Sequence, residues 1–447
     1  MIRGPAALLL QQKIADRMER CFAVFGLMLM IGTLLIFFGF DFEDFGNPAK
    51  GGGADGNLAY QVVVMAVYGI SLFLVIQRTE TVIWVIGRNK IFFLFLLYAL
   101  ISASWADTPG VTMRRSLALV GTSVFALYLV MRFESNDLLR LIALAFALTA
   151  VLSFAAALAI PSVGFQAGNP IYGMRGLMGH KNVLGRVMII GALAFMFLAR
   201  GASLKKPLYW AGFALTTSLV VLSLSRTAWI TMLLLVLVVV PFLDSLRRSR
   251  LSLGLRFTLI VGVGVTSVVI LILDYWESGL LLFGRDSSFT GRTLIWEYVI
   301  MAAWERPWFG YGFMSFWTGS GADFVYAYVK WGEFGHSHNA YIDLWANLGF
   351  VGCGLFFASL VVAGRRMFVR LTQTNDPMGM FYPCAMALML VLSLSANIFP
   401  QHGSIFWVIY SATLFYLSPI GFKKPRMLQV AQRLRPRRPA PRLAAQN

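Results

Sequence analysis

Charged residues are scarce in this chain, and acidic residues are the scarcest. Asp, Glu, Lys and Arg make up 13% of the 447 residues, whereas a typical soluble domain holds about 25%. The hydrophobic residues, 58% of the chain, fall in continuous blocks of roughly 17–25, the length that crosses a bilayer as a helix. The blocks do not alternate with a period of two, which argues against a transmembrane barrel. Since a chain in lipid must satisfy its backbone internally, we expect an all-α polytopic membrane protein.

Cysteine and histidine are rare as well. The three cysteines, Cys21, Cys353 and Cys384, show neither a pairing pattern nor metal-ligand spacing, so we assign them no chemistry. The four histidines have no acidic cluster beside them, which makes a zinc site unconvincing. We therefore predict no metal site and no cofactor.

The apolar blocks predict about twelve membrane spans. They lie at 21–40, 59–77, 91–105, 113–131, 139–160, 183–199, 208–224, 227–243, 257–273, 339–363, 379–399 and 403–420. The organisation that follows is an uncleaved N-terminal tail (1–20), nine spans (21–273), one large outer loop (274–337), three spans (338–420) and a basic tail (421–447). Within the outer loop, apolar residues at 295, 298, 299 and 302 predict a helix that ends before Pro307.

The distribution of basic residues predicts the orientation in the membrane. With twelve spans, both tails lie on one side, and 27 of the 38 lysines and arginines fall there. Basic loops mark the cytoplasmic side, so we expect both termini in the cytoplasm and the loop 274–337 in the periplasm. The formal charge of +18 is then explained by topology rather than by binding of nucleic acid.

The basic residues on the outer side need another reason. Arg226 follows Ser223 and Ser225 in a short hairpin between two apolar runs; its side chain either snorkels to a headgroup or reaches into a cavity. Arg292 opens the predicted loop helix, where it is either a solvated first-turn residue or part of a phosphate site formed with the helix N-terminus.

A third group of basic residues opens the span at 183–199. Arg175, His180 and Lys181 precede it, Asn182 is expected to cap it, and Arg186 lies one turn inside. A charge at that depth usually faces a polar cavity. We interpret this cluster as a candidate binding site.

The stretch from Phe334 to Trp345 contains two of the four histidines, His336 and His338, where the outer loop meets an apolar run. Taken alone, they are ordinary loop histidines. Beside several outward arginines they fit a general base or a hydrogen-bonding group aimed at a hydroxyl. The arginines suit an anionic leaving group such as a lipid diphosphate.

Five motifs, in order over roughly residues 165–360, resemble the O-antigen ligase and polymerase family of bacterial envelope glycan synthesis, and most closely its exopolysaccharide-production branch. They are Arg175-Gly-Leu-Met-Gly-His-Lys-Asn182, Ser225-Arg226-Thr-Ala-Trp229, Gly291-Arg292-Thr-x-x-Trp296, Glu305-Arg-Pro-Trp-Phe-Gly-Tyr-Gly312 and His336-Ser-His-Asn-x-Tyr-x-Asp343.

The resemblance implies a metal-independent inverting glycosyltransferase with a GT-C-like membrane fold. Such enzymes use undecaprenyl-diphosphate-linked glycan on the periplasmic side of the bacterial inner membrane. Carried over to this chain, the essential loop histidine matches His338, and the diphosphate-binding arginines match Arg226 and Arg292. Substrate-binding positions match Arg175, His180, Lys181, Asn182, Arg186, His336 and Asn339.

The leading hypothesis is therefore a polymerase of exopolysaccharide or O-antigen repeat units. Its partners would be the lipid-linked donor, a glycan acceptor, membrane lipids and a chain-length regulator. The nearest alternative is a ligase that transfers the finished glycan to lipid A core or to protein. A transporter of the lipid-linked sugar is a third hypothesis, but its expected mid-membrane charges and repeated halves are not evident.

Overall fold

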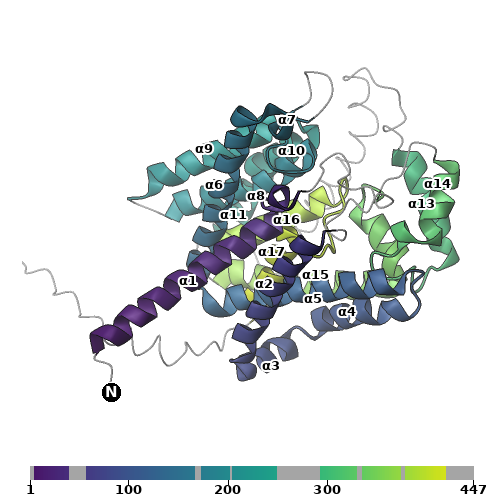
Figure 1. The fold of residues 1–447 in the computed structure, drawn as a ribbon, viewed down its shortest axis with the longest axis horizontal. Coiled ribbons are helices and arrows are strands. Elements are labelled where there is room, and N and C mark those ends of the chain that lie inside the picture. Colours follow the sequence, from purple (N-terminus) through teal and green to yellow (C-terminus); the bar gives the residue numbers. More distant parts are fainter. Residues whose placement is uncertain are drawn as a thin grey trace, which may run out of the picture.

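The computed structural model describes residues 5–39, 57–166, 173–201, 204–248, 292–329, 335–373 and 378–418, and this part of the chain is a bundle of helices without a β-sheet (Figure 1). One isolated bridge joins Phe165 to Met174. The chain is thus an all-α polytopic membrane protein, as predicted. The predicted span 257–273 and the basic tail 421–447 lie outside the described residues.

The helices follow the predicted apolar blocks. They are α1 (Pro5–Ile31), α2 (Leu58–Ile76), α3 (Thr79–Arg88), α4 (Lys90–Ile101), α5 (Pro109–Arg132), α6 (Ser135–Ala159), α7 (Pro161–Gly164), α8 (Lys181–Gly201), α9 (Lys206–Leu222), α10 (Arg226–Leu234), α11 (Val240–Arg248), α13 (Arg292–Glu305), α14 (Ser320–Tyr328), α15 (Ala340–Gln373), α16 (Phe381–Leu392) and α17 (Ile405–Tyr416). A π-helical turn, η5 (Leu235–Val239), joins α10 to α11, and short 3₁₀ turns include η7 (Phe316–Thr318).

Six of the described helical segments are long and apolar enough to cross a membrane. They correspond to α2, α5, α6, α8, the continuous segment from α10 to α11, and α15. The pair α3 and α4, bent by 92°, passes the same test jointly, and α16 and α17 are shorter apolar helices. The larger span number predicted from the sequence stays a prediction.

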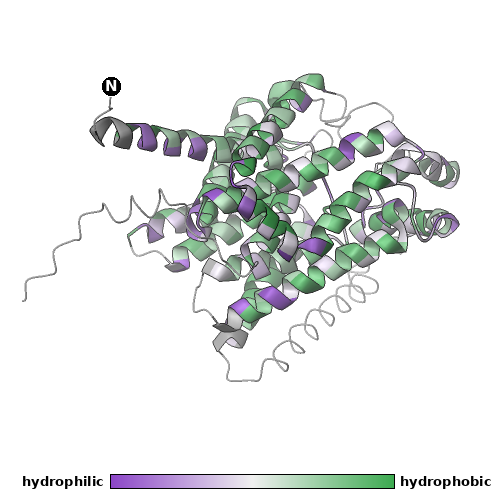
Figure 2. Cartoon of the chain, turned by 90° about the horizontal axis from the view of Figure 1, so that it is seen from below, coloured by the Kyte–Doolittle hydropathy of each residue, from purple (hydrophilic) through white to green (hydrophobic). Residues whose placement is uncertain are grey.

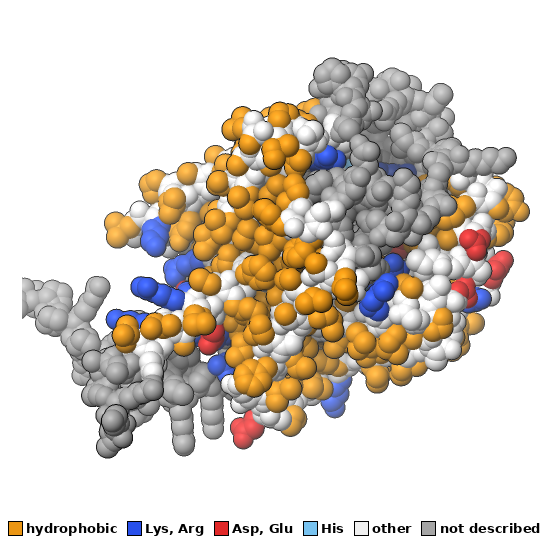
Figure 3. Space-filling model, viewed as in Figure 1, with side chains coloured by type: hydrophobic (Ala, Val, Ile, Leu, Met, Phe, Trp, Pro, Cys, Tyr) orange, Lys and Arg blue, Asp and Glu red, His pale blue; other side chains and the backbone are white. Residues whose placement is uncertain are grey.

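Many large hydrophobic side chains lie exposed on the exterior of the described bundle, which is typical of a protein solvated by lipid. In Figure 3, hydrophobic side chains cover much of the described part of the face, and charged ones are few, with several Lys and Arg at the left edge and several Asp and Glu at the right. Figure 2 shows the same along the helices, except that hydrophilic residues repeat along the N-terminal half of α1. The centre is α8, of which 83% of the spanning window is buried. Most of α8 therefore lies inside the bundle.

The long helix α15 is broken at Gly349, whose backbone (φ 62°, ψ −170°) is not helical. The break frees backbone groups on both sides, and residues 307–312 pair with them. Tyr311 and Gly312 donate their N–H groups to the carbonyls of Ala346 and Asn347, at N–O distances of 3.0 and 2.8 Å. In return, the N–H groups of residues 350 and 351 donate to the carbonyls of residues 307 and 308. The Glu-Arg-Pro-Trp-Phe-Gly-Tyr-Gly motif is thus the structural complement of a broken helix.

The helices α13 and α14 form a separate group beside the bundle (Figure 1). The predicted loop helix is confirmed as α13, which buries Ile295, Val299 and Ala302. The turn between α4 and α5 holds this group, since Asp107 pairs with Arg306 at 2.7 Å and accepts the N–H of Ser320 at 3.1 Å. These contacts hold the end of α13 and the start of α14 against that turn.

Substitution of Gly349 by alanine should destabilise the protein strongly. The positive φ disfavours any side chain, and a Cβ there would lie 2.3 Å from the backbone of Trp308. The expected loss in the free energy of unfolding is about 3 kcal/mol, measured as a lower unfolding temperature in detergent.

The matched control is Gly354→Ala on the same helix, where a Cβ would meet nothing within 4 Å. Since alanine favours a helix more than glycine, this variant should gain about 0.5–1 kcal/mol. Equal unfolding temperatures for the two variants would contradict the assigned role of Gly349.

Candidate functional site

The histidine loop, which we define as residues 335–339, is shaped by its own side chains. Asn339 caps α15, because its Oδ1 accepts the N–H groups of Tyr341 (3.0 Å) and Ile342 (3.3 Å). The Oγ of Ser337 donates to the carbonyl of Asn339 at 2.9 Å. His338 adopts a left-handed backbone with φ of 60°, a conformation that costs about 1–3 kcal/mol in a non-glycine residue. The loop therefore holds a strained conformation that its surroundings must enforce.

Two neighbouring elements enforce it. The buried carboxylate of Asp343 accepts the N–H of Ser337 at 3.1 Å and the indole N–H of Trp317, in η7, at 2.9 Å. From α13, the indole N–H of Trp296 donates to the carbonyl of Ser337 at 2.8 Å. Both sides of Ser337, the residue between the two histidines, are thus fixed.

The two histidine rings of the loop touch each other. Their centroids lie 4.1 Å apart and their planes are nearly perpendicular, at 84°. The N–H of His338 donates to Nδ1 of His336 at 3.2 Å. Both side chains are partly buried, so the pair forms one unit at the start of α15.

The start of α8 repeats this hydrogen bond. Nδ1 of His180 accepts the N–H of Asn182 at 3.0 Å. The expectation that Asn182 caps this helix is wrong, because α8 already begins at Lys181 and the imidazole of His180 takes the capping position. Arg186 lies one turn further, and its Nε donates to the carbonyl of Asn182 at 2.9 Å.

Electrostatics shows that the start of α8, the start of α13 and the histidine loop converge. Burial, followed by the charges of Arg186 and Arg292, lowers the pKa of His336 to about 4. Burial, His336 and the same two arginines hold the pKa of His338 far below its usual range. Burial and the charges of Arg186, Lys181 and Arg175 lower the pKa of His180 to about 4. All three histidines therefore lie within the field of Arg186, and His336 and His338 lie within that of Arg292 as well.

Arg226 opens α10 beside this cluster. The predicted hairpin is confirmed, because α9 ends at Leu222 and α10 begins at Arg226. The hairpin packs on α8 at Gly185, where a Cβ would lie 2.8 Å from the Cβ of Ala228. The side chain of Arg226 is exposed, and its contact with a substrate stays a prediction.

Two other predicted site residues have structural contacts. The buried guanidinium of Arg175 donates to the carbonyls of Ser162 and Val163 in α7, at 2.9 and 3.0 Å. The Oδ1 of Asn339 is engaged in the helix cap described above. Substrate contacts of these side chains, and those of Lys181 and Asn182, stay predictions.

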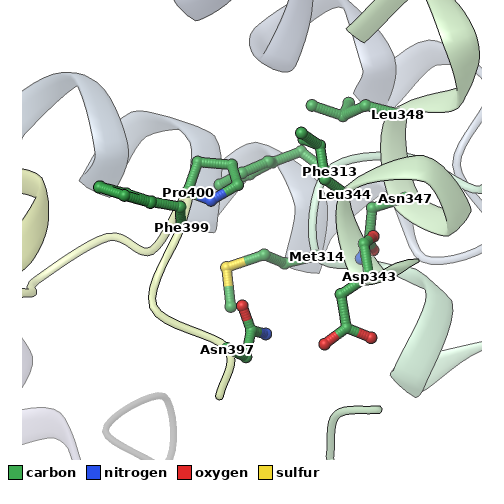
Figure 4. Close-up of a pocket in the computed structure, with 9 residues that line it drawn as sticks. All are labelled: Phe313, Met314, Asp343, Leu344, Asn347, Leu348, Asn397, Phe399 and Pro400. Carbon is green, nitrogen blue, oxygen red and sulfur yellow. The ribbon is translucent and has the colours of Figure 1, made fainter. Parts of the chain in front are cut away.

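Sequence analysis assigned no role to Asp343, Trp296 or Trp317. Asp343 and Trp296 belong to the motifs quoted above. Asp343 also gave a visible signal, because it is an acidic residue in the first turn of a helix. The sequence nevertheless does not show which residues these side chains contact. Asp343 also lines a small pocket behind the histidine loop (Figure 4). Asp343 and Asn347 form one side of it, and Asn397 lies opposite.

The arrangement combines guanidinium groups with imidazoles, and the chemistry of each group is known in general terms. Guanidinium groups pair with phosphate oxygens through charge-assisted hydrogen bonds. A neutral imidazole can accept a proton, but burial and the neighbouring arginines make the imidazole of His338 a weak base until an anion offsets their charge. Within the described ranges, no group of three or more His, Cys, Asp or Glu side chains is placed to hold a metal ion.

Removal of the Asp343 carboxylate should loosen the histidine loop. Asp343→Ala leaves the buried N–H groups of Ser337 and Trp317 without this acceptor, at a cost of about 1–3 kcal/mol for each. Asp343→Asn keeps one oxygen and should lose less. Thermal unfolding, together with amide hydrogen exchange of the loop, measures both effects. Wild-type exchange in the alanine variant would contradict the assigned contacts.

Neutralising Arg292 should raise the pKa of two histidines and leave a third unchanged. In Arg292→Gln, less repulsion opposes the imidazolium form, so the pKa of His336 and His338 should rise. His180 is an internal control, because its pKa is lowered by burial, Arg186, Lys181 and Arg175. NMR of the ring carbons of labelled histidine, titrated over pH, measures this. Equal shifts at all three would mean that the variant disturbs the whole fold.

The chain is similar to known proteins over much of its length. Residues 211–357 match the family model Wzy_C, described as O-antigen ligase. The match contains Arg226, Arg292, His336 and His338 but not the cluster at 175–186. The exopolysaccharide production protein ExoQ of Rhizobium meliloti (strain 1021) is 26% identical over 337 residues, covering 72% of this chain and 75% of that protein. These two matches support an assignment of the chain to the O-antigen ligase and polymerase family.

Proposed function

We propose that this protein is a metal-independent, inverting glycosyltransferase that polymerises exopolysaccharide or O-antigen repeat units. It would act on undecaprenyl-diphosphate-linked glycan at the periplasmic side of the bacterial inner membrane. The observation that carries the proposal is the convergence of Arg186, Arg292 and three neutral histidines at the ends of α8, α13 and the histidine loop.

The reaction exchanges one bond at the anomeric carbon of the donor sugar. The acceptor hydroxyl forms a new C1–O bond as the bond between C1 and the diphosphate oxygen breaks. His338 takes the hydroxyl proton, and the electron pair leaves on the diphosphate. Arg292 and Arg226 would bind that diphosphate, and Arg186 supplies further positive charge. Positively charged donors that face the leaving group lower the barrier in the role that a metal ion has in other transferases.

The proposed topology follows from the charge distribution. The bias of basic residues supports cytoplasmic termini and a periplasmic loop between spans nine and ten of a twelve-span, GT-C-like fold. The substrate-binding set would include His180, Lys181, Asn182, Arg175, His336 and Asn339 around the two arginines. A chain-length regulator would be a further partner.

One observation favours the alternative of a ligase. The matching family model is described as O-antigen ligase, and a ligase would use the same donor and the same cationic site. Only the acceptor differs, which would be lipid A core or a protein instead of a second lipid-linked repeat unit. The similarity to an exopolysaccharide production protein favours the polymerase.

The variant His338→Ala should abolish long polymer at normal protein level. Without the base, the acceptor hydroxyl cannot lose its proton at a useful rate, and a loss of about 100-fold or more is expected. The measurement is the size distribution of lipid-linked glycans in cells carrying the variant.

The accumulated intermediate separates the candidates. Single lipid-linked repeat units would support the polymerase, whereas long lipid-linked polymer that is not attached to an acceptor would support the ligase. Normal glycan would contradict both. Arg200→Gln, at the opposite end of α8 from Arg186, serves as the control for a general effect of changing this helix.

A further inference from the structure

Two histidines of the site bind the backbone through the same ring atom. Nδ1 of His180 accepts the N–H of Asn182 at 3.0 Å, and Nδ1 of His336 accepts the N–H of His338 at 3.2 Å. In both cases the imidazole closes a small ring onto the amide two residues ahead. The two contacts lie on different segments of the chain, at the start of α8 and in the histidine loop.

This hydrogen bond fixes the tautomer of each ring. A backbone N–H can only donate, so the Nδ1 that receives it must carry a lone pair and no proton. A neutral imidazole has one N–H, which must then be at Nε2. His180 and His336 therefore present Nε2–H, a hydrogen-bond donor, and hold no ring nitrogen free to accept a proton in that form.

We propose that His180 and His336 act as neutral hydrogen-bond donors, through Nε2–H, to the phosphate oxygens of the bound lipid diphosphate. With His180 and His336 as donors, His338 remains as the base. In the described part of the chain, no hydrogen bond occupies the ring nitrogens of His338, whose ring instead packs edge-on against His336. The identity of the anion rests on the proposed function, whereas the tautomers follow from the two hydrogen bonds alone.

The surrounding charges agree with neutral donors. The groups that act on His336 are Arg186 from α8, Arg292 from α13, His180, and the backbone of His336 itself, whose hydrogen bond with the ring opposes the others by raising the pKa. The nearest carboxylate of α15, Asp343, is engaged with Ser337 and Trp317. Burial and these cations lower the pKa of His336 to about 4, and burial with Arg186, Lys181 and Arg175 does the same for His180.

Neutral donors have a clear physical advantage here. Two imidazolium ions would add positive charge to a partly buried site that already holds two arginines, at a large cost before substrate arrives. Neutral N–H groups add directed hydrogen bonds to the anion without that repulsion. They also keep the field around His338 independent of pH over the physiological range.

Asparagine and glutamine substitutions separate the two ring nitrogens of each histidine. Asparagine places its oxygen where Nδ1 lies and retains the backbone contact, but it cannot reach the position of Nε2. Glutamine places an amide N–H near the position of Nε2 and loses the backbone contact. The experiment measures binding of undecaprenyl diphosphate to the full chain in detergent, by calorimetry, for His336→Asn, His336→Gln, His180→Asn and His180→Gln.

The proposal predicts that both asparagine variants bind undecaprenyl diphosphate about tenfold more weakly than wild type, since each loses one hydrogen bond to a charged group. Both glutamine variants should bind within about twofold of wild type. Unfolding temperatures should follow the opposite order, because asparagine keeps the backbone contact. Weaker binding by the glutamine variants than by the asparagine variants would overturn the proposal and assign the histidines a purely structural role.

The pH dependence provides the second readout. Between pH 8 and 5.5, affinity should change equally for wild type and His336→Gln, because only the phosphate titrates. A wild-type affinity that rises about tenfold more than that of the variant would mean an imidazolium ligand and overturn the proposal.

Wild-type protein that binds undecaprenyl diphosphate no better than undecaprenol would overturn the proposed function as well, whereas equal binding by all four variants would overturn only the histidine assignment.

Discussion

A helix that is interrupted must find partners for the backbone groups it frees, and the architecture of this protein depends on how α15 meets that requirement at Gly349. The carbonyls of Ala346 and Asn347 accept the N–H groups of Tyr311 and Gly312, and the N–H groups after the break donate to residues 307 and 308. Because unpaired buried backbone groups are costly, this exchange fixes the chain after α13 to α15. It thereby fixes α13 itself, which carries Arg292 at one end and, through Trp296, holds the histidine loop.

The requirement that buried polar groups be hydrogen-bonded also shapes the site. Asp343 accepts two N–H groups, Asn339 caps the first turn of α15, and two imidazoles accept backbone N–H groups. Hydrogen bonds thus hold the imidazoles that could bind substrate through Nδ1 and leave Nε2 of each ring available. Burial, together with Arg186 at all three histidines and Arg292 at His336 and His338, lowers the pKa values and favours neutral imidazoles. The positive charge of the site therefore rests on guanidinium groups, which do not titrate.

Several residues show how far sequence reasoning reached. The loop helix from Arg292 to its end before Pro307 was predicted by its apolar spacing and confirmed. The hairpin before Arg226 was predicted by polar residues between apolar runs and is present. Asn182 was expected to cap α8, and the prediction was wrong because the sequence does not show that the ring of His180 can reach back to the backbone. No local pattern could predict the break of α15, since a single glycine within an apolar run is common in membrane helices.

Composition and hydropathy by themselves determined the class of the protein, the order of its helices and the side of the membrane that its charges favour. These properties depend on the free energy of transferring each segment from water into lipid, and each segment contributes to that free energy by itself. Ordered motifs were enough to identify the family. Only the tertiary structure decided which cations meet which histidines, that Asp343 and Trp296 hold the loop, and that Nδ1 of His180 and His336 is occupied. Apart from the two Nδ1 contacts, those facts depend on residues far apart in the sequence, such as Trp296 and Ser337 at 41 positions, and no local free energy specifies such pairings.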